Sequence, residues 1–205
     1  MTLESLRIVD GRPGLRSLID RAVGLDASAS ARFRQLDGQS VDVFVTTPFQ
    51  VVASRRITGS ASRDGAVVAA TDLLDALRDE AEDIGPARDP NWPGALPPAS
   101  GFAIVDTLPV QVVRELADKG QALARQFSGP LGPPASLLDQ AVITLDGTVE
   151  VPMRMIFACT SLGLIPGFSA PIDIPRHLRV STTGRWVRID APFGSVYRST
   201  SLSLF

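Results

Sequence analysis

Cysteine and histidine are nearly absent from this sequence. The 205 residues include one cysteine, Cys159, and one histidine, His177. A structural zinc site normally takes three or four Cys or His ligands, and an internal disulfide needs two cysteines, so neither is expected. Cys159 lies in an apolar run and should be a small buried hydrophobe, because thiols in such surroundings are inert. The acidic stretch 79–83 is typical of a solvated helix end, so we expect no metal site.

Motifs for nucleotide chemistry and for activated nucleophiles are also missing. The chain has no P-loop, no G-x-G-x-x-G between a strand and a helix, and no G-x-S-x-G turn. Its one lysine, Lys119, falls on the outer face of an expected helix, which argues against Schiff-base chemistry. We therefore expect no catalytic residues and no cofactor, and these absences favour a protein that is not an enzyme without excluding one.

Long apolar runs and a strong net charge are lacking as well. No stretch holds 18 uncharged apolar residues, and the first residues do not have the pattern of a signal peptide. The formal net charge of -2 creates no general attraction to nucleic acid or to an anionic membrane. Nineteen of the 20 cationic side chains are arginine, which we attribute to a GC-rich coding bias. These features predict a cytoplasmic protein with no membrane partner.

The composition is otherwise that of a folded protein. Hydrophobic residues make up 44% and charged residues 20% of the chain, close to the average for globular proteins. The patterning predicts an α+β fold, with antiparallel hairpins or a meander in both halves and helices packed on the sheet. We divide the chain into an N-terminal half (1–85), a Pro- and Gly-rich strap (86–100) and a C-terminal half (101–205), and expect one integrated domain.

In the first half the hydrophobic period changes from helical to alternating. Residues 14–25 have the spacing of an amphipathic helix, and Asp26 is a good N-cap for a second helix to about residue 36. Alternation then predicts a hairpin of residues 41–47 and 51–58. The remaining elements expected in this half are a third strand at 66–70, completing a meander, and a helix at 72–81.

The second half repeats this mixture. Asp146-Gly147 between runs rich in Val, Ile and Thr is a strong hairpin signal, because a type I′ turn needs positive φ at both central residues. Residues 152–165 carry polar groups only along one narrow line, which predicts a helix surrounded by core. The other elements expected here are a strand at 101–107, a helix at 109–127, a C-terminal hairpin turning at 182–184, and a strand at 196–204.

The stretch NWPGALPPASG (91–101) joins the two halves. A flexible spacer does not need a tryptophan, and its prolines stiffen the backbone. We therefore interpret the stretch as an ordered strap, with Trp92 anchored in the seam between the halves. A binding loop and a plain tether are the alternatives.

Arginine is concentrated near the C-terminus. Alternation along 185–190 places Trp186 and Arg188 on the less apolar face of a strand, and Arg179 would share that face across the hairpin. Such a surface combines guanidinium groups with an aromatic plane, as surfaces that bind nucleic acid or anions do. The candidate binding residues predicted from the sequence are Arg176, His177, Arg179, Trp186 and Arg188.

These observations support three hypotheses about function. The first is a non-enzymatic interaction or accessory protein, with a protein partner or a second copy of itself. The second is binding of nucleic acid or an anionic ligand through the C-terminal hairpin. The third is an enzyme or small-ligand binder with a pocket where His177 meets groups distant in sequence.

Overall fold

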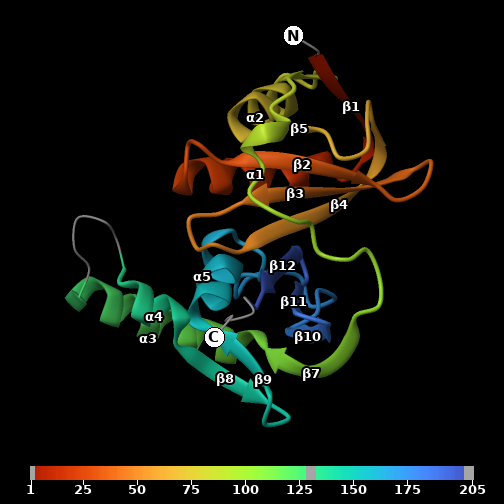
Figure 1. Cartoon of the computed structure of the whole chain (residues 1–205). Helices are drawn as coiled ribbons and strands as arrows, with labels where there is room; N and C mark the ends of the chain where they lie inside the picture. The colour runs from red at the N-terminus through yellow and green to blue at the C-terminus, as the bar shows by residue number, and fades with distance from the viewer. Residues whose placement is uncertain (1–2, 128–132, 201–205) are drawn as a thin grey trace, which may run out of the picture. The chain divides into compact units, whose positions relative to one another are not determined.

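The computed structural model describes residues 3–127 and 133–200, and these form two compact units. Unit 1 takes the described residues up to Pro48 and those from Val52 to Ala99. Unit 2 comprises the described residues 100–127 and 133–200 and the short segment Phe49–Val51. The α+β class predicted from the sequence is confirmed, because both units combine helices with antiparallel strands (Figure 1). The expectation of one integrated domain stays a prediction.

Unit 1 contains a twisted antiparallel sheet and two α-helices. Four strands follow the order β5-β2-β3-β4, while β1 pairs with β4 and β6 pairs with β1. The elements are β1 (Leu3–Asp10), α1 (Arg12–Leu25), β2 (Ser30–Gln35), β3 (Ser40–Thr46), β4 (Val52–Ala61), β5 (Val67–Ala69), α2 (Ala70–Arg78), β6 (Asp83–Pro86) and the 3-10 turn η1 (Asp89–Asn91).

The core of unit 1 lies between its helix pair and the sheet. Helices α1 and α2 pack against each other, and both contact strands of the sheet. Leu15 and Ile19 of α1 and Leu73 of α2 are fully buried, as are Phe33 and Phe44 of the sheet. The helical spacing read from the sequence therefore identified the buried face of α1.

Two expectations for unit 1 are wrong. Residues 30–35 form β2 and not a helix, because Ala31 and Phe33 point into the core while the strand pairs along its whole length with β3. Asp26 does accept the Ser28 N–H at 2.8 Å, but it closes a turn. The third strand, β5, pairs with β2 and not with β4, so the strands do not form a simple meander.

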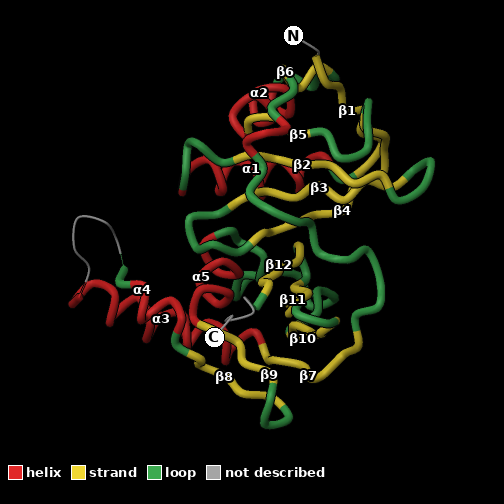
Figure 2. Tube along the Cα trace, viewed as in Figure 1, coloured by secondary structure: helices red, strands yellow, loops and turns green. Residues whose placement is uncertain are grey.

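The Pro-rich stretch is an extended connection that carries one short turn (Figure 2). Its first part is attached to unit 1, since Arg88 donates its N–H to the Val67 carbonyl at 2.7 Å and Asp89 accepts the Val67 N–H at 3.0 Å. Trp92 is buried, and the Arg32 guanidinium lies 5.9 Å from its ring centroid. Its place in a seam between halves stays a prediction.

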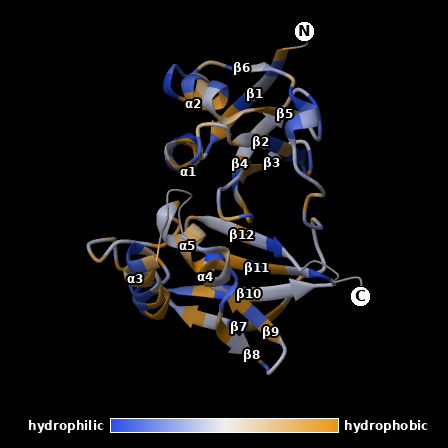
Figure 3. Ribbon diagram, turned by 60° about the vertical axis from the view of Figure 1, so that its left-hand side comes forward, coloured by the Kyte–Doolittle hydropathy of each residue, from blue (hydrophilic) through white to orange (hydrophobic). Residues whose placement is uncertain are grey.

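Unit 2 has a four-stranded antiparallel sheet in the order β12-β11-β10-β7, a separate hairpin β8-β9, and three α-helices. Hydrophobic and hydrophilic residues are interleaved along α3, as its amphipathic pattern predicts (Figure 3). The elements are β7 (Ala103–Pro109), α3 (Val110–Phe127), α4 (Ala135–Asp139), β8 (Ala141–Leu145), β9 (Val149–Pro152), α5 (Met153–Ser161), β10 (His177–Thr183), β11 (Trp186–Ala191) and β12 (Gly194–Ser199).

The predicted hairpins of unit 2 are confirmed. Asp146 and Gly147 have φ values of 48° and 70°, as a type I′ turn requires. The C-terminal hairpin turns one residue later than expected, at Gly184 and Arg185. The strand expected at 196–204 begins at Gly194, and its last part lies outside the described residues.

Helix α5 is surrounded by core, as its narrow polar line predicted. Its residues from Met153 to Cys159 are all buried, including Arg154. Burial raises the pKa of the Cys159 thiol to about 12, so this thiol is inert at neutral pH. The guanidinium of Arg154 donates to the Phe49 carbonyl at 2.7 Å and to Asp139 at 2.5 Å. One buried arginine therefore fixes the segment Phe49–Val51 within unit 2.

Candidate functional site

The C-terminal hairpin of unit 2 carries most of the residues singled out from the sequence. In the register of β10 and β11, Arg179 lies opposite Asp190, Ser181 opposite Arg188, and Thr183 opposite Trp186. Directly opposed residues of an antiparallel pair share a face of the sheet. Arg179, Trp186 and Arg188 are therefore on one face, which we call the open face.

Arg188 is already engaged on the open face. Its Nε lies 2.9 Å from an Asp190 carboxylate oxygen, and its guanidinium lies 4.3 Å from the ring centroid of Phe102. Phe102 in turn meets Tyr197 edge to face at 6.1 Å, and Ser195 donates to Asp190 at 2.6 Å. These contacts leave Arg179 as the exposed cation of this face, with Trp186 half-buried two strand positions before Arg188.

Arg176 supports a loop. The loop Pro166–Ile174, which we call the display loop, lies between α5 and β10. Arg176 donates from its two terminal nitrogens to the Gly167 and Ala170 carbonyls, both at 2.8 Å. The sequence suggested that Arg176 binds a ligand, but its guanidinium is committed to the backbone of its own chain.

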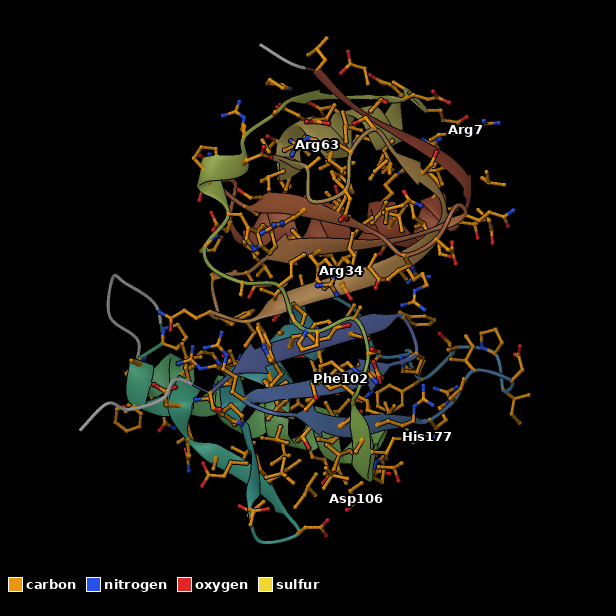
Figure 4. The ribbon with its side chains drawn as sticks, turned by 45° about the vertical axis from the view of Figure 1, so that its right-hand side comes forward. Arg7, Arg34, Arg63, Phe102, Asp106 and His177 are labelled. Atoms are coloured by element: carbon orange, nitrogen blue, oxygen red, sulfur yellow. The ribbon has the colours of Figure 1, made fainter. Side chains whose placement is uncertain are left out.

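The display loop presents two large apolar side chains to solvent. Phe168 is 88% exposed and Ile172 is 99% exposed. A second arginine, Arg114 of α3, lies 4.7 Å from the Phe168 ring centroid and donates to the Pro166 carbonyl. In Figure 4 the loop extends away from the sheet of unit 2, just before the strand that starts at His177. The loop is thus ordered by two arginines while its largest apolar side chains stay uncovered.

His177 is exposed at the first position of β10, opposite Pro109 of β7 (Figure 4). A polar groove opens at the far end of β10, where Thr182 and Gly184 line it. The predicted pocket at His177 gains no support from this groove.

The groove lies between the β8-β9 hairpin and the turn end of the sheet, and its volume is about 270 Å³. One wall comes from Thr148, Val149 and Glu150. The sheet side contributes two arginines, Arg185 and Arg198, beside residues that carry hydroxyl groups. The residues of the sheet side are Thr182, Gly184, Arg185, Trp186, Val187, Arg198 and Thr200.

Arg185, Arg198, Phe168 and Ile172 were not among the residues singled out from the sequence. Alternation could have indicated the two arginines, because Arg185 and Val187 share a face and so do Arg198 and Thr200. The exposure of Phe168 and Ile172 had no sequence signal, since neither residue belongs to a segment with helical or alternating periodicity.

The described residues 3–127 and 133–200 contain no group of three or more His, Cys, Asp or Glu side chains arranged to hold a metal ion. Among the helices described, none has the length and hydropathy needed to cross a membrane.

Sequence comparison places the chain in a family. Residues 97–203, just over half of the chain, match a domain of unknown function, DUF8185. The chain belongs to the DUF8185 family. Residues 1–94 of this DUF8185 protein match a second domain of unknown function, DUF8010. No curated protein gives a significant match.

Solved structures with the same fold are DNA polymerase sliding clamps. The DUF8185 chain superposes on the clamp of Bacillus subtilis with a TM-score of 0.58 at 9% identity, covering 100% of its own length and 66% of the clamp. For the Bartonella birtlesii DnaN clamp (DNA polymerase III subunit beta) bound to griselimycin, the TM-score is 0.57 at 14% identity, with 98% and 66% covered. The chain thus spans slightly less than two thirds of these clamps and shares their fold.

Proposed function

We propose that this DUF8185 protein is a cytoplasmic, non-enzymatic accessory protein that docks onto another protein or onto a second copy of itself. The observation that carries the proposal is the display loop, whose Phe168 and Ile172 side chains are almost fully exposed. Burying one such side chain is worth about 1.5–3 kcal/mol, so a partner that covers both gains a substantial part of its binding energy.

The support beneath the loop favours a docking role over chance exposure. Arg114 and Arg176 bind three loop carbonyls between them, so the loop is held in one conformation before any partner arrives. A preorganised loop loses little conformational entropy on binding, which increases affinity. Exposed apolar side chains on a rigid support are typical of protein interaction sites.

The fold likeness supports the same class of function. The matched structures are named as subunits and sliding clamps of DNA polymerase, which are components of a larger assembly. An accessory role would account for the shared fold in a chain whose sequence lacks the common catalytic motifs. Among the described residues β7 is the last strand of the unit 2 sheet, and its edge, which carries the exposed Ile104, offers a further surface for a second copy.

Site-specific photocrosslinking tests the proposal. The photoreactive residue p-benzoylphenylalanine at position 168 or 172 should crosslink to a small, reproducible set of proteins in cells, or to a second copy of the chain. The same residue at Asp118, an exposed position of α3, is the control. Crosslinking that is equal at all three positions, together with a strictly monomeric protein in sedimentation velocity, would contradict the proposal.

Nucleic-acid binding through the open face is a second candidate, favoured by the shared face of Arg179 and Trp186. It predicts salt-sensitive binding of single-stranded DNA or RNA that weakens in Arg179→Ala and Trp186→Ala. Arg188→Ala should have less effect, because Asp190 and Phe102 already engage that guanidinium. Unchanged mobility of oligonucleotides at low salt would remove this candidate.

A further inference from the structure

We propose that the groove between the β8-β9 hairpin and the turn end of the sheet binds the terminal phosphate of a small phosphomonoester. This site goes beyond the docking role of the display loop and uses different residues. Its basis is the convergence of Arg185 and Arg198 on one polar hollow of about 270 Å³.

Strand register explains why the two arginines converge. Arg198 lies opposite Val187, and the Thr200 N–H donates to the Arg185 carbonyl at 2.8 Å. Arg185, which directly precedes β11, and Arg198 are therefore diagonal neighbours across an antiparallel pair, a spacing of about 7–8 Å with Cβ atoms somewhat closer. Side chains as long as arginine can reach a common anion across that spacing, and the guanidinium fork suits phosphate oxygens.

The hydrogen-bonding capacity of these arginines is largely unused. Within the described part of the chain, the Arg185 guanidinium makes no ion pair or hydrogen bond. The carboxylate beside Arg198 is Asp139, at 3.8 Å, and the same oxygen accepts a stronger contact from Arg154 at 2.5 Å. Asp139 is thus already neutralised by Arg154, which leaves Arg198 available to an anion.

The rest of the groove restricts the ligand. Thr148 and Thr182 line it and can donate hydroxyl hydrogen bonds to phosphate oxygens, whereas the Thr200 hydroxyl donates to the Arg185 carbonyl at 3.0 Å. Glu150 on the opposite wall repels further negative charge and can accept a hydrogen bond from a ligand hydroxyl group. The volume is at the small end for ligand sites, which excludes a dinucleotide. The chemistry fits one phosphate on a small hydroxyl-bearing framework, either a free metabolite or the end of a nucleic-acid strand.

Titration of the full-length protein with ribose 5-phosphate, followed by amide chemical shifts, tests the site. Shifts should be confined to residues that line the groove, and inorganic phosphate should compete. Arg185→Gln and Arg198→Gln should each weaken binding by about tenfold or more, equivalent to 1.4 kcal/mol. The matched control is Arg125→Gln, which removes the same charge from an exposed position of α3 and should leave binding unchanged.

The phosphate can come from a free metabolite or from the end of a nucleic-acid strand. An oligonucleotide with and without a 5′-phosphate distinguishes these two sources. Tighter binding of the phosphorylated form, lost in Arg185→Gln, extends the site to strand ends. The proposal is overturned if ribose 5-phosphate at millimolar concentration shifts no groove residue, or if Arg125→Gln reduces binding as much as Arg185→Gln does. The variant Phe168→Ser/Ile172→Ser should keep phosphate binding, so failure of the docking proposal and failure of this one give different results.

Discussion

The two units use their arginines in different ways. In unit 1 the cations pair with carboxylates: Arg63 bridges Glu4 at 2.8 Å and Asp89 at 2.8 Å, and Arg56 pairs with Asp42 at 2.7 Å. Unit 2 also has such pairs, Arg154 with Asp139 and Arg188 with Asp190. Its Arg114 and Arg176, however, donate to backbone carbonyls of the display loop. The arginines named in unit 1 neutralise carboxylates of their own unit. Those bound to carbonyls in unit 2 hold a loop in an exposed position.

This difference separates residues that maintain a fold from residues that present a surface. Glu4 is buried, and its two oxygens accept hydrogen bonds from Arg63 and Ser62, so it links β1 to the loop before β5. Nothing comparable covers Phe168 or Ile172 in the described residues of unit 2. We therefore expect substitutions in unit 1 and in the core of unit 2 to lower stability, and substitutions in the display loop to change binding alone.

The largest effect is expected from Trp92→Ala in unit 1. Loss of a buried aromatic side chain typically costs about 3–5 kcal/mol. Hydrogen exchange of the β2 and β3 amides measures the free energy of opening of unit 1, and Trp92→Phe is the matched control that keeps most of the packing. If Trp92→Ala changes this free energy by less than about 0.5 kcal/mol, the Pro-rich stretch is only a tether.

A smaller loss is expected from Arg154→Met in unit 2. Methionine fills similar space, but the Phe49 carbonyl loses its donor and Asp139 loses the closer of its two ion pairs, leaving Arg198 at 3.8 Å. Removing one partner of a buried polar cluster costs about 2–4 kcal/mol, and the partial exposure of Asp139 favours the lower end. Exchange of the β10 and β11 amides reports the change. Arg125→Met, an exposed position of α3, should have little effect, and equal losses in the two variants would show that Arg154 is dispensable.

Sequence patterns predicted the elements whose signals are local. Asp146-Gly147 specified its turn through backbone conformation alone, and the alternation of the C-terminal hairpin placed Arg179, Trp186 and Arg188 on one face. The helix predicted after Asp26 is wrong. The Asp26 side chain suits a helix N-cap, but pairing of β2 with β3 outweighs helix propensity in the residues that follow. Local backbone preference is enough to specify a turn. In a longer element, pairing with a distant strand can override that preference.

The groove and the display loop depend on such long-range arrangement. Arg185 and Arg198 converge because of the β11-β12 register and the position of the β8-β9 hairpin, which the local sequence does not encode. Arg176 was predicted as a binding residue because it is cationic. The atoms that it binds, the Gly167 and Ala170 carbonyls, have no signature in the sequence.

Acid should weaken unit 1 through the Arg63 cluster. A hydrogen bond from Arg63 holds the pKa of Asp89 below its ordinary value of 3.8. A carboxylate with a depressed folded-state pKa contributes stability that is complete above its unfolded pKa and is lost as pH falls through the folded one. Opening of unit 1 should therefore become easier as pH falls below about 4, and Arg63→Met should reduce this dependence. An unchanged pH profile in Arg63→Met would show that other carboxylates, such as Asp37, dominate.

The smallest effect on stability is expected from Phe168→Ser/Ile172→Ser in unit 2. Both side chains are exposed in the folded protein, so their removal takes almost no buried area from the core. Such surface changes stay within about 0.5 kcal/mol, and urea denaturation should not distinguish the variant from the wild type. Association with the partners that crosslinking identifies should be lost in the same variant. A loss of stability of about 2 kcal/mol would mean that the loop packs against its own unit. The display loop would then help to maintain the fold, as the Arg63 cluster does in unit 1, and the difference between the two units would no longer hold.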